Sequence, residues 1–386
     1  MKNTIKIGNA LLAMAMSFMT GVVLAQEPVR IGVISSVTGP IAFVGLSHKN
    51  SMALLPTKVG DTDLKYVFYD DASDPTQTVR LAKKLLSEDK IDVLLGPSGS
   101  PNAIAAIPFM AQAKTPMLAV VGTQAAVLPM DDQKRWVFKT TQNDDLMAAA
   151  LVEHMRSAGV KTIGFIGYND SYGESWHKTI EPMLKDNNIR IVANERYSRN
   201  DSSITGQVTK LFAAKPDTVF VAGVGAGSAL PNIQLRKMGY KGTIYQTHGA
   251  ASPDYIKVGG ESVEGTIMAA SPMLVLSEIP DSNASKKLAT EYVEAYKKAY
   301  DVAPPTFGAA FYDGGLLLKN AIPQAIKHGK PGTEEFRTAL RDALENTKEL
   351  VVTQGVYNMT GQDHSGFDKR GRVLMVIKDG KFTLLH

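Results

Sequence analysis

Short apolar runs alternate with helical patterns along most of the chain. In the first part, apolar or β-branched runs predict strands at 29–35, 64–69, 91–95 and 116–121. A second set of such runs follows at 161–167, 189–193, 218–222 and 242–246. The runs show little polar alternation, which is typical of strands whose two faces are both covered by helices. The pattern therefore predicts an α/β fold with parallel sheets.

Helical patterns separate the predicted strands. Asp74 and Pro75 predict the start of one helix, with Asp74 as the N-cap and Pro75 in the first turn. Helices are also expected between the strands of the second set, at 145–158, 173–187, 202–214 and 228–238. Two sheets of about five strands each imply two lobes, since one lobe would not easily hold all of these strands.

The pattern changes after the second set of strands. Further helices are predicted for Ser285–Tyr300, for most of Thr306–His328 and for Phe336–Leu344. The tail shows the pattern of strands and turns, and Lys378-Asp-Gly-Lys381 predicts a hairpin turn. We therefore expect a third, mainly helical section before a short β-rich end.

The N-terminus has the features of a secretory signal. Two lysines are followed by an uncharged apolar run that ends in Val23-Leu24-Ala25. The run is about long enough to span a bilayer, which leaves an uncleaved anchor as the alternative. Because Ala25 suits a signal peptidase and Pro28 interrupts a continuing helix, we predict a signal peptide over residues 1–25, cleaved after Ala25. The mature protein is then expected in the periplasm.

Composition narrows the function classes. The chain of 386 residues contains no Cys, which excludes disulfides, thiol nucleophiles, iron–sulfur clusters and a lipid anchor on a Cys. The formal net charge is +4, and no basic stripe indicates binding to nucleic acid. The seven His residues show no metal-ligand spacing. We expect no metal and no cofactor.

Loops that follow predicted strands are the candidate ligand site, because open parallel sheets bind ligands beyond the carboxyl ends of their strands. After the third predicted strand, Gly99 and Ser100 precede a helix whose free N–H groups favour a carboxylate. An ordinary capped turn is the alternative there. After the fourth strand, Gly122 and Thr123 are again small or polar, and Thr123 either caps a helix or donates its hydroxyl to a ligand. Together these loops predict a shared anion pocket.

The second set of strands offers larger side chains at the corresponding edge. Tyr172 lies between a strand and a helix, where it would stack on a ligand or hydrogen-bond to it, unless it is a surface aromatic residue. His248 follows a strand and is expected to donate a hydrogen bond or carry a charge, with a structural role as the alternative. The loop 223–227 is rich in Gly, but the spacing of a dinucleotide-binding motif fails at Ser228. We expect this loop to leave room for a ligand.

Catalytic motifs are not complete in these loops. Gly96-Pro-Ser98-Gly-Ser100 misses the Gly-x-Ser-x-Gly pattern of a nucleophile elbow at its last position. Asp70 and Asp71 form a carboxylate pair at a strand end, where a solvated turn beside Asp74 is a simpler interpretation than acid–base catalysis. We therefore do not expect an enzyme.

Several short runs are specific when they are taken together. They are Ile31-Gly-Val, Thr38-Gly39-Pro40, Tyr69-Asp70-Asp71, Asp74-Pro75, Leu95-Gly96-Pro97, Pro116, Val137-Phe138-Lys139-Thr140 and Tyr172-Gly173. With these runs the chain resembles the periplasmic solute-binding proteins of branched-chain amino acid (leucine/isoleucine/valine) type ABC importers. The resemblance covers nearly all of the mature chain.

The resemblance implies a type I periplasmic binding fold, with two Rossmann-like lobes joined by three crossovers. Lobe one would comprise 28–140 plus 272–348, and lobe two 143–269 plus 351–386. In this family a ligand closes the lobes by a hinge motion, and the closed form docks on the permease subunits of the transporter. We expect a monomer that binds a small-molecule carboxylate or an amino acid.

The ligand-binding positions of the family carry over in part. Ser100 matches the position that holds the ligand carboxylate. Thr123 matches the hydroxyl position after the fourth strand, with Val121 and Gly122 beside it. Tyr172 matches the tyrosine of the cleft. The resemblance thus implies that the carboxylate end of the site is kept.

Three family positions differ in this chain. His248 stands where amino acid binders hold the ligand ammonium with an acidic side chain. Val224 replaces a second aromatic residue, and Phe43 stands in place of a tryptophan in the first loop. A neutral or cationic His cannot replace a carboxylate as counter-ion, and an unpaired buried ammonium costs several kcal/mol. The amino end of the site is therefore expected to be lost.

These differences lead to a hypothesis about the ligand: a carboxylate without an α-amino group, with an aromatic acid such as a hydroxybenzoate fitting best. His248 would meet a ring hydroxyl, while Tyr172 and Phe43 would flank the ring. The Tyr-Gln-Thr-His-Gly run around His248 also resembles a subgroup of aromatic-acid binders. The alternative within the family is a branched-chain or other amino acid binder that pairs the ammonium with Asp170 or Glu174. A sensor domain or an enzyme on the same fold is the alternative from another class.

Overall fold

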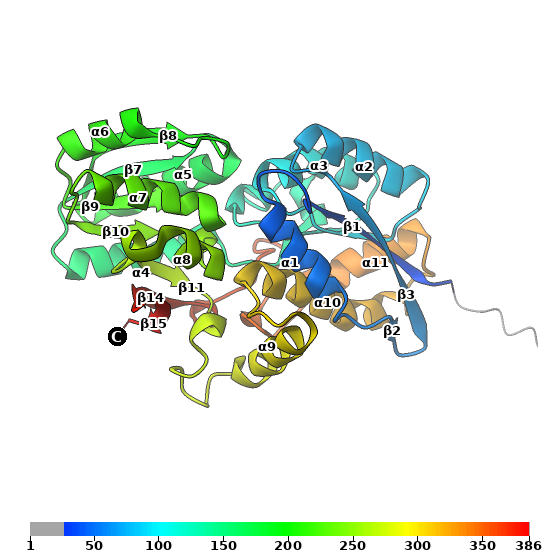
Figure 1. The fold of residues 1–386 in the computed structure, drawn as a ribbon. Helices are drawn as coiled ribbons and strands as arrows, with labels where there is room; N and C mark the ends of the chain where they lie inside the picture. The colour runs from blue at the N-terminus through cyan, green and yellow to red at the C-terminus, as the bar shows by residue number, and fades with distance from the viewer. Residues whose placement is uncertain (1–26, 386) are drawn as a thin grey trace, which may run out of the picture.

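Two sheets organise the part of the chain that the computed structural model describes, residues 27–385. The predicted signal peptide, residues 1–25, lies outside the described residues. Each sheet belongs to its own lobe, and the lobes lie side by side (Figure 1). This arrangement confirms the predicted α/β fold of two lobes.

Lobe one is built on a six-stranded sheet. Its strands are β1 (Val29–Ser35), β2 (Lys58–Val59), β3 (Thr62–Asp70), β4 (Val93–Leu95), β5 (Met117–Ala119) and β6 (Val137–Lys139). They lie in the order β2-β3-β1-β4-β5-β6 and are parallel, except that β2 pairs antiparallel with β3. The helices of this lobe are α1 (Ala42–Met52), α2 (Pro75–Ser87), α3 (Ser100–Gln112), α9 (Lys286–Tyr300), α10 (Thr306–Ala325) and α11 (Glu334–Glu345).

Helices cover both faces of this sheet, which explains the continuous apolar runs of its strands. Ile31 and Val33 of β1 share a core with residues of α10 and α11. Ile34 belongs to a second core on the opposite face, with residues of α2 and α3. Asp74 caps α2 as predicted, because its carboxylate accepts the Thr76 N–H at 2.7 Å.

Lobe two is built on a seven-stranded sheet. Its strands are β7 (Thr162–Tyr168), β8 (Arg190–Tyr197), β9 (Thr218–Ala222), β10 (Thr243–Gln246), β11 (Ile267–Ala270), β14 (Val373–Lys378) and β15 (Lys381–Leu384). The order is β15-β14-β11-β10-β9-β7-β8, and only β14 and β15 run antiparallel to their neighbours. The helices of this lobe are α4 (Asp144–Ser157), α5 (Ser171–Asp186), α6 (Thr205–Ala213), α7 (Ala229–Lys237) and α8 (Pro253–Gly259). Lys378 pairs with Lys381, which confirms the predicted hairpin turn.

The chain passes between the lobes three times, as the resemblance implies. The first passage joins β6 to α4, and the second joins β11 to α9. The third leads from β13 (Gly355–Tyr357) to β14. Both lobes are therefore connected by segments that are short enough to act as a hinge.

The hydrophobic pattern does not predict every element. Helix α1 has no apolar stripe, because Ser47, His48 and Ser51 are among its buried residues. Strands β6 and β11 span only three and four residues, which is too short for a periodic signal. With these two strands each sheet would have five; the two-residue strand β2 adds a sixth to lobe one, and β14 and β15 of the tail bring lobe two to seven.

The C-terminal tail is divided between the lobes, contrary to its predicted place in lobe two. Strands β12 (Leu350–Val352) and β13 form a small separate sheet, and Tyr357 and Phe367 lie in the core of lobe one. The buried carboxylate of Asp313 on α10 anchors this segment by accepting the Thr353 N–H at 2.9 Å. Only β14 and β15 join the sheet of lobe two. The other lobe boundaries stay predictions.

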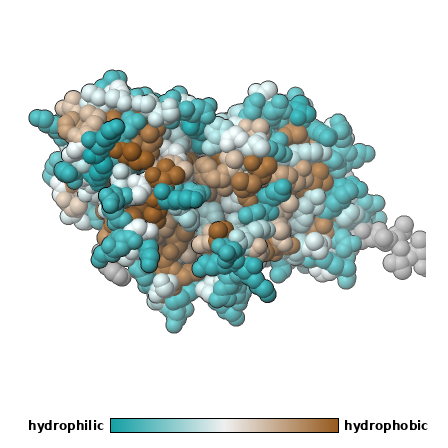
Figure 2. Space-filling view, viewed as in Figure 1, coloured by the Kyte–Doolittle hydropathy of each residue, from teal (hydrophilic) through white to brown (hydrophobic). Residues whose placement is uncertain are grey.

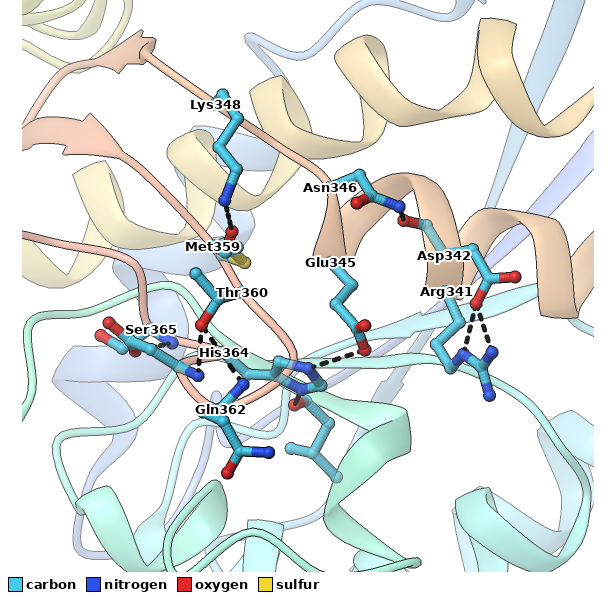
Figure 3. Close-up of polar contacts among 12 residues, drawn as sticks. Arg341, Asp342, Glu345, Asn346, Lys348, Met359, Thr360, Gln362, His364 and Ser365 are labelled. Atoms are coloured by element: carbon cyan, nitrogen blue, oxygen red, sulfur yellow. Dashed lines mark hydrogen bonds and ion pairs between the residues drawn. The ribbon is translucent and has the colours of Figure 1, made fainter.

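The first part of the third passage, a loop between β13 and β14, also packs on lobe one (Figure 3). His364 is fully buried, and its Nδ1 donates to the Val137 carbonyl at 2.8 Å. Its ring stacks on Phe138 with the centroids 4.2 Å apart, and its Nε2 lies 3.3 Å from the Glu345 carboxylate. The loop thereby covers the free edge of β6, which would otherwise expose unpaired backbone groups.

The carboxylate pair at the end of β3 is not the solvated turn that we expected. Asp71 is fully buried and accepts hydrogen bonds from the side chains of Ser36, Thr78 and Asn102. Asp70 accepts the Val37 N–H at 3.0 Å. The pair therefore ties the loops of lobe one together, which is a structural role.

Within residues 27–385, every helix is too short or too polar to cross a bilayer.

Candidate functional site

A cavity lies between the two lobes. It holds about 50 Å³, several times the roughly 10–15 Å³ that one buried water needs. Its wall comes from the loops at the carboxyl ends of the strands of both sheets, together with the start of α10. Figure 2 shows apolar residues gathered where the two lobes meet. The cavity thus occupies the edge where parallel sheets bind ligands.

Seven of the nine predicted site residues line this cavity. They are Gly99, Ser100, Val121, Gly122, Tyr172, Val224 and His248. The other two, Thr123 and Phe43, lie close by but outside the wall. The strand-end rule therefore brings most of the predicted side chains together.

The start of α3 forms one end of the cavity. Gly99 is the N-cap with an extended backbone, and Ser100 is the first helical residue rather than the cap. No side chain caps this helix, so its first N–H groups have no side-chain acceptor. An uncapped helix start with a hydroxyl beside it is suited to an anionic group.

The loop after β5 contributes Val121 and Gly122 to the wall. Thr123 caps a single 3₁₀ turn, η1 (Gln124–Ala126), and not the predicted helix. Its hydroxyl accepts the Ala125 N–H at 3.2 Å. The Thr123 hydroxyl thus has the capping role, the first of the two that the sequence suggests, and Thr123 does not line the cavity.

A buried lysine holds this loop in place. Lys139, at the end of β6, donates from Nζ to the Gly122 carbonyl at 2.6 Å. Burial lowers the pKa of Lys139 to about 8, while the nearby Asp144 carboxylate favours the charged form. Lys139 was part of a motif that carries the resemblance, but the sequence gives no sign that it supports the site.

Gly122 is also a point of close approach between the two lobes at the cavity. A Cβ at this position would lie 2.5 Å from the Tyr172 ring and 3.2 Å from Nε2 of His248. Because Gly122 has no side chain, Tyr172 and His248 of lobe two can pack closely against this loop of lobe one.

Tyr172 and His248 form the wall of lobe two opposite this loop. The Tyr172 hydroxyl lies 2.7 Å from Oγ1 of Thr247, and only 2% of the residue is exposed. The His248 ring lies between Tyr172 and Trp176, with ring centroids 6.5 Å and 5.6 Å away. Tyr172 is thus fixed by a partner in its own lobe.

His248 is neutral and has free hydrogen-bonding capacity. Among the described residues, neither of its buried ring nitrogens has a hydrogen-bond partner. Burial, followed by the Lys139 charge, lowers the pKa of His248 to about 3. The neutral imidazole offers one donor and one acceptor.

Phe43 packs across the lobes instead of lining the cavity. A Cβ on Gly225, whose φ is +54°, would overlap the Phe43 ring. Phe43 also meets Phe307 edge to face, with the centroids 5.8 Å apart. Phe307, at the start of α10, is the phenylalanine that lines the wall instead. The sequence did not single it out, because α10 lies far from the strands that define the site.

Arg199 is the one charged side chain among the described residues of the wall. It follows β8, and its Nε donates to the Asp170 carboxylate at 2.6 Å. Its guanidinium lies over the Tyr168 ring, 4.3 Å from the centroid. Nothing in the strand pattern pointed to this loop, because β8 is the edge strand of its sheet.

Carboxylates do not reach the cavity within the described chain: no Asp or Glu lines it. Asp170, one of the two proposed partners for an ammonium, is paired with Arg199. The other, Glu174, accepts from Nε and Nη2 of Arg196. The remaining polar groups of the wall are neutral: Ser98, Thr141, Gln142, Ser271, Thr306 and Gln354.

One serine of the wall lies beside a histidine but lacks the third member of a catalytic triad. Oγ of Ser98 lies 3.3 Å from Nδ1 of His48 and 2.8 Å from Oγ of Ser35. Burial lowers the pKa of His48 to about 3, and its Nε2 finds no acceptor among the described residues. A histidine without an orienting carboxylate is poorly suited to act as a base.

The sequence and the fold match one family of proteins. The family described as periplasmic binding protein matches residues 28–381. The Leu/Ile/Val-binding protein BraC3 of Rhizobium johnstonii is 26% identical over 370 residues, covering 93% of this chain and 94% of that protein. The leucine-, isoleucine-, valine-, threonine- and alanine-binding protein of Pseudomonas aeruginosa is 22% identical over 383 residues, covering 96% of this chain and 94% of that protein.

Solved structures agree with this match. An extracellular ligand-binding receptor from Rhodopseudomonas palustris HaA2 superposes with a TM-score of 0.90 at 41% identity, covering 93% of this chain and 100% of that chain. The branched-chain amino acid transporter substrate-binding protein LivJ from Streptococcus pneumoniae, solved with isoleucine, has a TM-score of 0.74 at 18% identity and covers 92% of this chain and 98% of that chain. The second likeness concerns the fold alone.

Proposed function

Because this chain belongs to the periplasmic binding protein family, whose members bind substrates and are not enzymes, we propose that it captures a small aromatic carboxylate between its lobes. The family places the protein in the periplasm, as the sequence predicts. In our proposal the closed protein delivers its ligand, as a monomer, to the permease subunits of an ABC importer.

One observation carries the choice of ligand: the described wall of the cavity contains no carboxylate. An α-ammonium in this cavity would be buried without a counter-ion, which costs several kcal/mol. The neutral hydroxyl and amide groups of the wall can hydrogen-bond to an ammonium but cannot balance its charge. A ligand without an amino group avoids this cost.

The rest of the wall supports an aromatic acid. The uncapped start of α3 beside Ser100 suits the carboxylate. Apolar side chains, among them Val121, Val224 and Phe307, suit the faces of a ring. The neutral His248 suits a ring hydroxyl, because it can accept or donate a hydrogen bond.

Amino acid binding is the second candidate, since curated relatives named as Leu/Ile/Val-binding proteins match over nearly the whole chain. That function needs an ammonium partner. Asp170 and Glu174 are the carboxylates proposed for it, and each is already paired with an arginine. An amino acid ligand would have to break one of these pairs.

Thermal shift measurements test the proposal. We expect 4-hydroxybenzoate and benzoate to raise the melting temperature more than leucine does, because a ligand stabilises the state that it binds. The His248→Ala variant should lose part of the shift with 4-hydroxybenzoate and keep the shift with benzoate. Stronger stabilisation by leucine than by either acid would overturn the proposed ligand class.

A further inference from the structure

We infer that Arg199 binds the anionic group of the ligand from lobe two, opposite the start of α3, and so couples anion recognition to closure of the lobes. The inference rests on the proposed carboxylate ligand and adds the residue that selects it. It makes Arg199 a specificity-determining residue at a position that the resemblance did not indicate.

The position of Arg199 places its charge at the carboxylate end of the cavity. Arg199 lines the cavity between the lobes together with Gly99 and Ser100. It also lines a second cavity of about 90 Å³ at the edge of the cleft, where Pro101 and Asn102 of α3 face it. The guanidinium therefore lies across the cleft from the first turn of α3.

Two neighbours hold the Arg199 side chain in this orientation. One oxygen of Asp170 accepts from Nε of Arg199 at 2.6 Å, while the other accepts the Tyr172 N–H at 2.8 Å and so caps α5. The guanidinium also lies over the Tyr168 ring, where it makes a favourable cation–π contact. Because Asp170 is tied to the helix, it fixes Arg199 as well as pairing with it.

Arg199 lines the cavity and keeps unused donors. Within residues 27–385, neither Nη1 nor Nη2 of Arg199 donates to a protein acceptor, although only 18% of the side chain is exposed. A guanidinium with two open nitrogens matches the two oxygens of a carboxylate. The pairing of Nε with Asp170 thus leaves Nη1 and Nη2 available to donate to a ligand.

Arg196 provides an internal comparison, because it lies near the end of β8, just before Arg199, and pairs with Glu174 in the first turn of α5. Its Nε and Nη2 donate to Glu174, and its Nη1 donates to Asn194 and to the Glu195 carbonyl. All of its nitrogens are therefore engaged, and it does not line the cavity. The two arginines share a charge and a neighbourhood, but only Arg199 has donors left for a ligand.

Binding the anion from both sides would favour the closed form. The start of α3 belongs to lobe one, whereas Arg199 belongs to lobe two, so one carboxylate can engage both only when the lobes are closed. A ligand shifts a conformational equilibrium only by its differential affinity for the two states. A neutral isostere, which forms no charge-assisted bond with Arg199, should close the lobes less.

Calorimetric titration of three proteins with two probes tests the inference. The proteins are the wild type, Arg199→Gln and the control Arg196→Gln, and the probes are 4-hydroxybenzoate and the neutral 4-hydroxybenzamide. We expect Arg199→Gln to weaken the binding of 4-hydroxybenzoate by about 30-fold, as for loss of a charge-assisted bond. The same variant should weaken the binding of 4-hydroxybenzamide by less than about threefold, because the amide carries no charge. Arg196→Gln should change both by less than about threefold. Equal losses for the acid in Arg199→Gln and Arg196→Gln would overturn the inference.

A second variant guards against misfolding of Arg199→Gln. Arg199→Lys keeps a cation beside Asp170 but removes the planar fork, so we expect about a tenfold loss for 4-hydroxybenzoate with an unchanged melting temperature. Unchanged affinity of this variant would overturn the inference while the proposed function stands. If the wild type binds no carboxylate at all, the proposed function fails first, and the inference fails with it.

Discussion

The two lobes contribute very different surfaces to the same cavity. At the ends of its strands, lobe one offers small residues, Gly99, Ser100 and Gly122, while its large aromatic wall residue, Phe307, comes from α10. Lobe two offers large side chains, among them Tyr172 and His248. The backbone of lobe one can hold a carboxylate whatever the rest of the ligand is, whereas the side chains of lobe two must fit the particular ligand. The difference indicates that lobe one recognises a class and lobe two selects a member.

Within lobe two, the side chains differ in whether their polar groups have hydrogen-bond partners. Tyr172 is fixed by Thr247, and Arg199 is oriented by Asp170. His248 has no hydrogen-bond partner among the described residues at either ring nitrogen. A buried polar group without a partner is costly, so His248 is where a ligand would most improve the closed structure.

The largest effect should come from filling the space between the lobes. Gly122→Ala would place a methyl group 2.5 Å from the Tyr172 ring, so the closed form should be strongly disfavoured. We expect about 100-fold weaker binding of every ligand by calorimetry, equivalent to almost 3 kcal/mol. Gly206→Ala is the matched control, because a Cβ there meets nothing within 4 Å. Unchanged affinity of Gly122→Ala would show that the lobes close differently.

A carboxylate at position 248 should reverse the selectivity of lobe two. In His248→Glu, the new charge would repel a ligand carboxylate and supply the missing counter-ion for an ammonium. We expect about 30-fold weaker binding of 4-hydroxybenzoate and a gain in leucine binding, both measured by thermal shift and calorimetry. His248→Gln, which adds no charge, is the control. The idea fails if His248→Glu still prefers the aromatic acid.

The pH dependence of affinity should report the burial of His248. In an open form the ring would titrate near its ordinary pKa of about 6.5, whereas burial in the closed form lowers the pKa of His248 to about 3. The closed form then binds fewer protons below pH 6.5, so closure and affinity should weaken as the pH falls and level off above pH 7.

The size of this effect can be measured against a control. At pH 5.5 we expect about a tenfold loss of affinity for 4-hydroxybenzoate, whose carboxylate stays ionised there. His248→Gln should remove this loss. Asp144, whose pKa burial raises to about 6, titrates in both proteins, so the difference between their calorimetric profiles isolates His248. Affinity that rises toward pH 5.5 only in the wild type would mean that a charged imidazole binds the ligand.

The smallest effect is expected at the carboxylate that an amino acid binder would need. Glu174 is half-exposed, and Arg196 holds the pKa of its carboxyl below the ordinary value. Glu174→Gln should leave the affinity for 4-hydroxybenzoate within about twofold in calorimetric titrations, as for a surface ion pair. A large loss of affinity for leucine in this variant would favour the amino acid alternative.

The sequence predicts the parts of the site that depend on one lobe. Gly99, Gly122, Tyr172 and His248 follow strands, and the strand-end rule alone places them at the cavity. Most strands and helices are equally visible, because the strands are continuous apolar runs and most helices carry periodic apolar faces. These features are local, so one stretch of sequence contains the whole signal.

Features that depend on contact between distant segments could not be predicted from the sequence. Phe307 replaces Phe43 in the wall because Phe43 packs against Gly225 of the other lobe. Arg199 reaches the cavity from an edge strand only because the lobes are closed together. Helix α1 buries polar residues, among them His48, and therefore lacks the apolar stripe by which helices are predicted.

The most direct test of the ligand class is a calorimetric titration of the wild-type protein with 4-hydroxybenzoate and with leucine under the same conditions. The cavity wall without a carboxylate and with a neutral His248 predicts that 4-hydroxybenzoate binds more tightly by at least about tenfold. Tighter binding of leucine would contradict the account and return this protein to the amino acid binders.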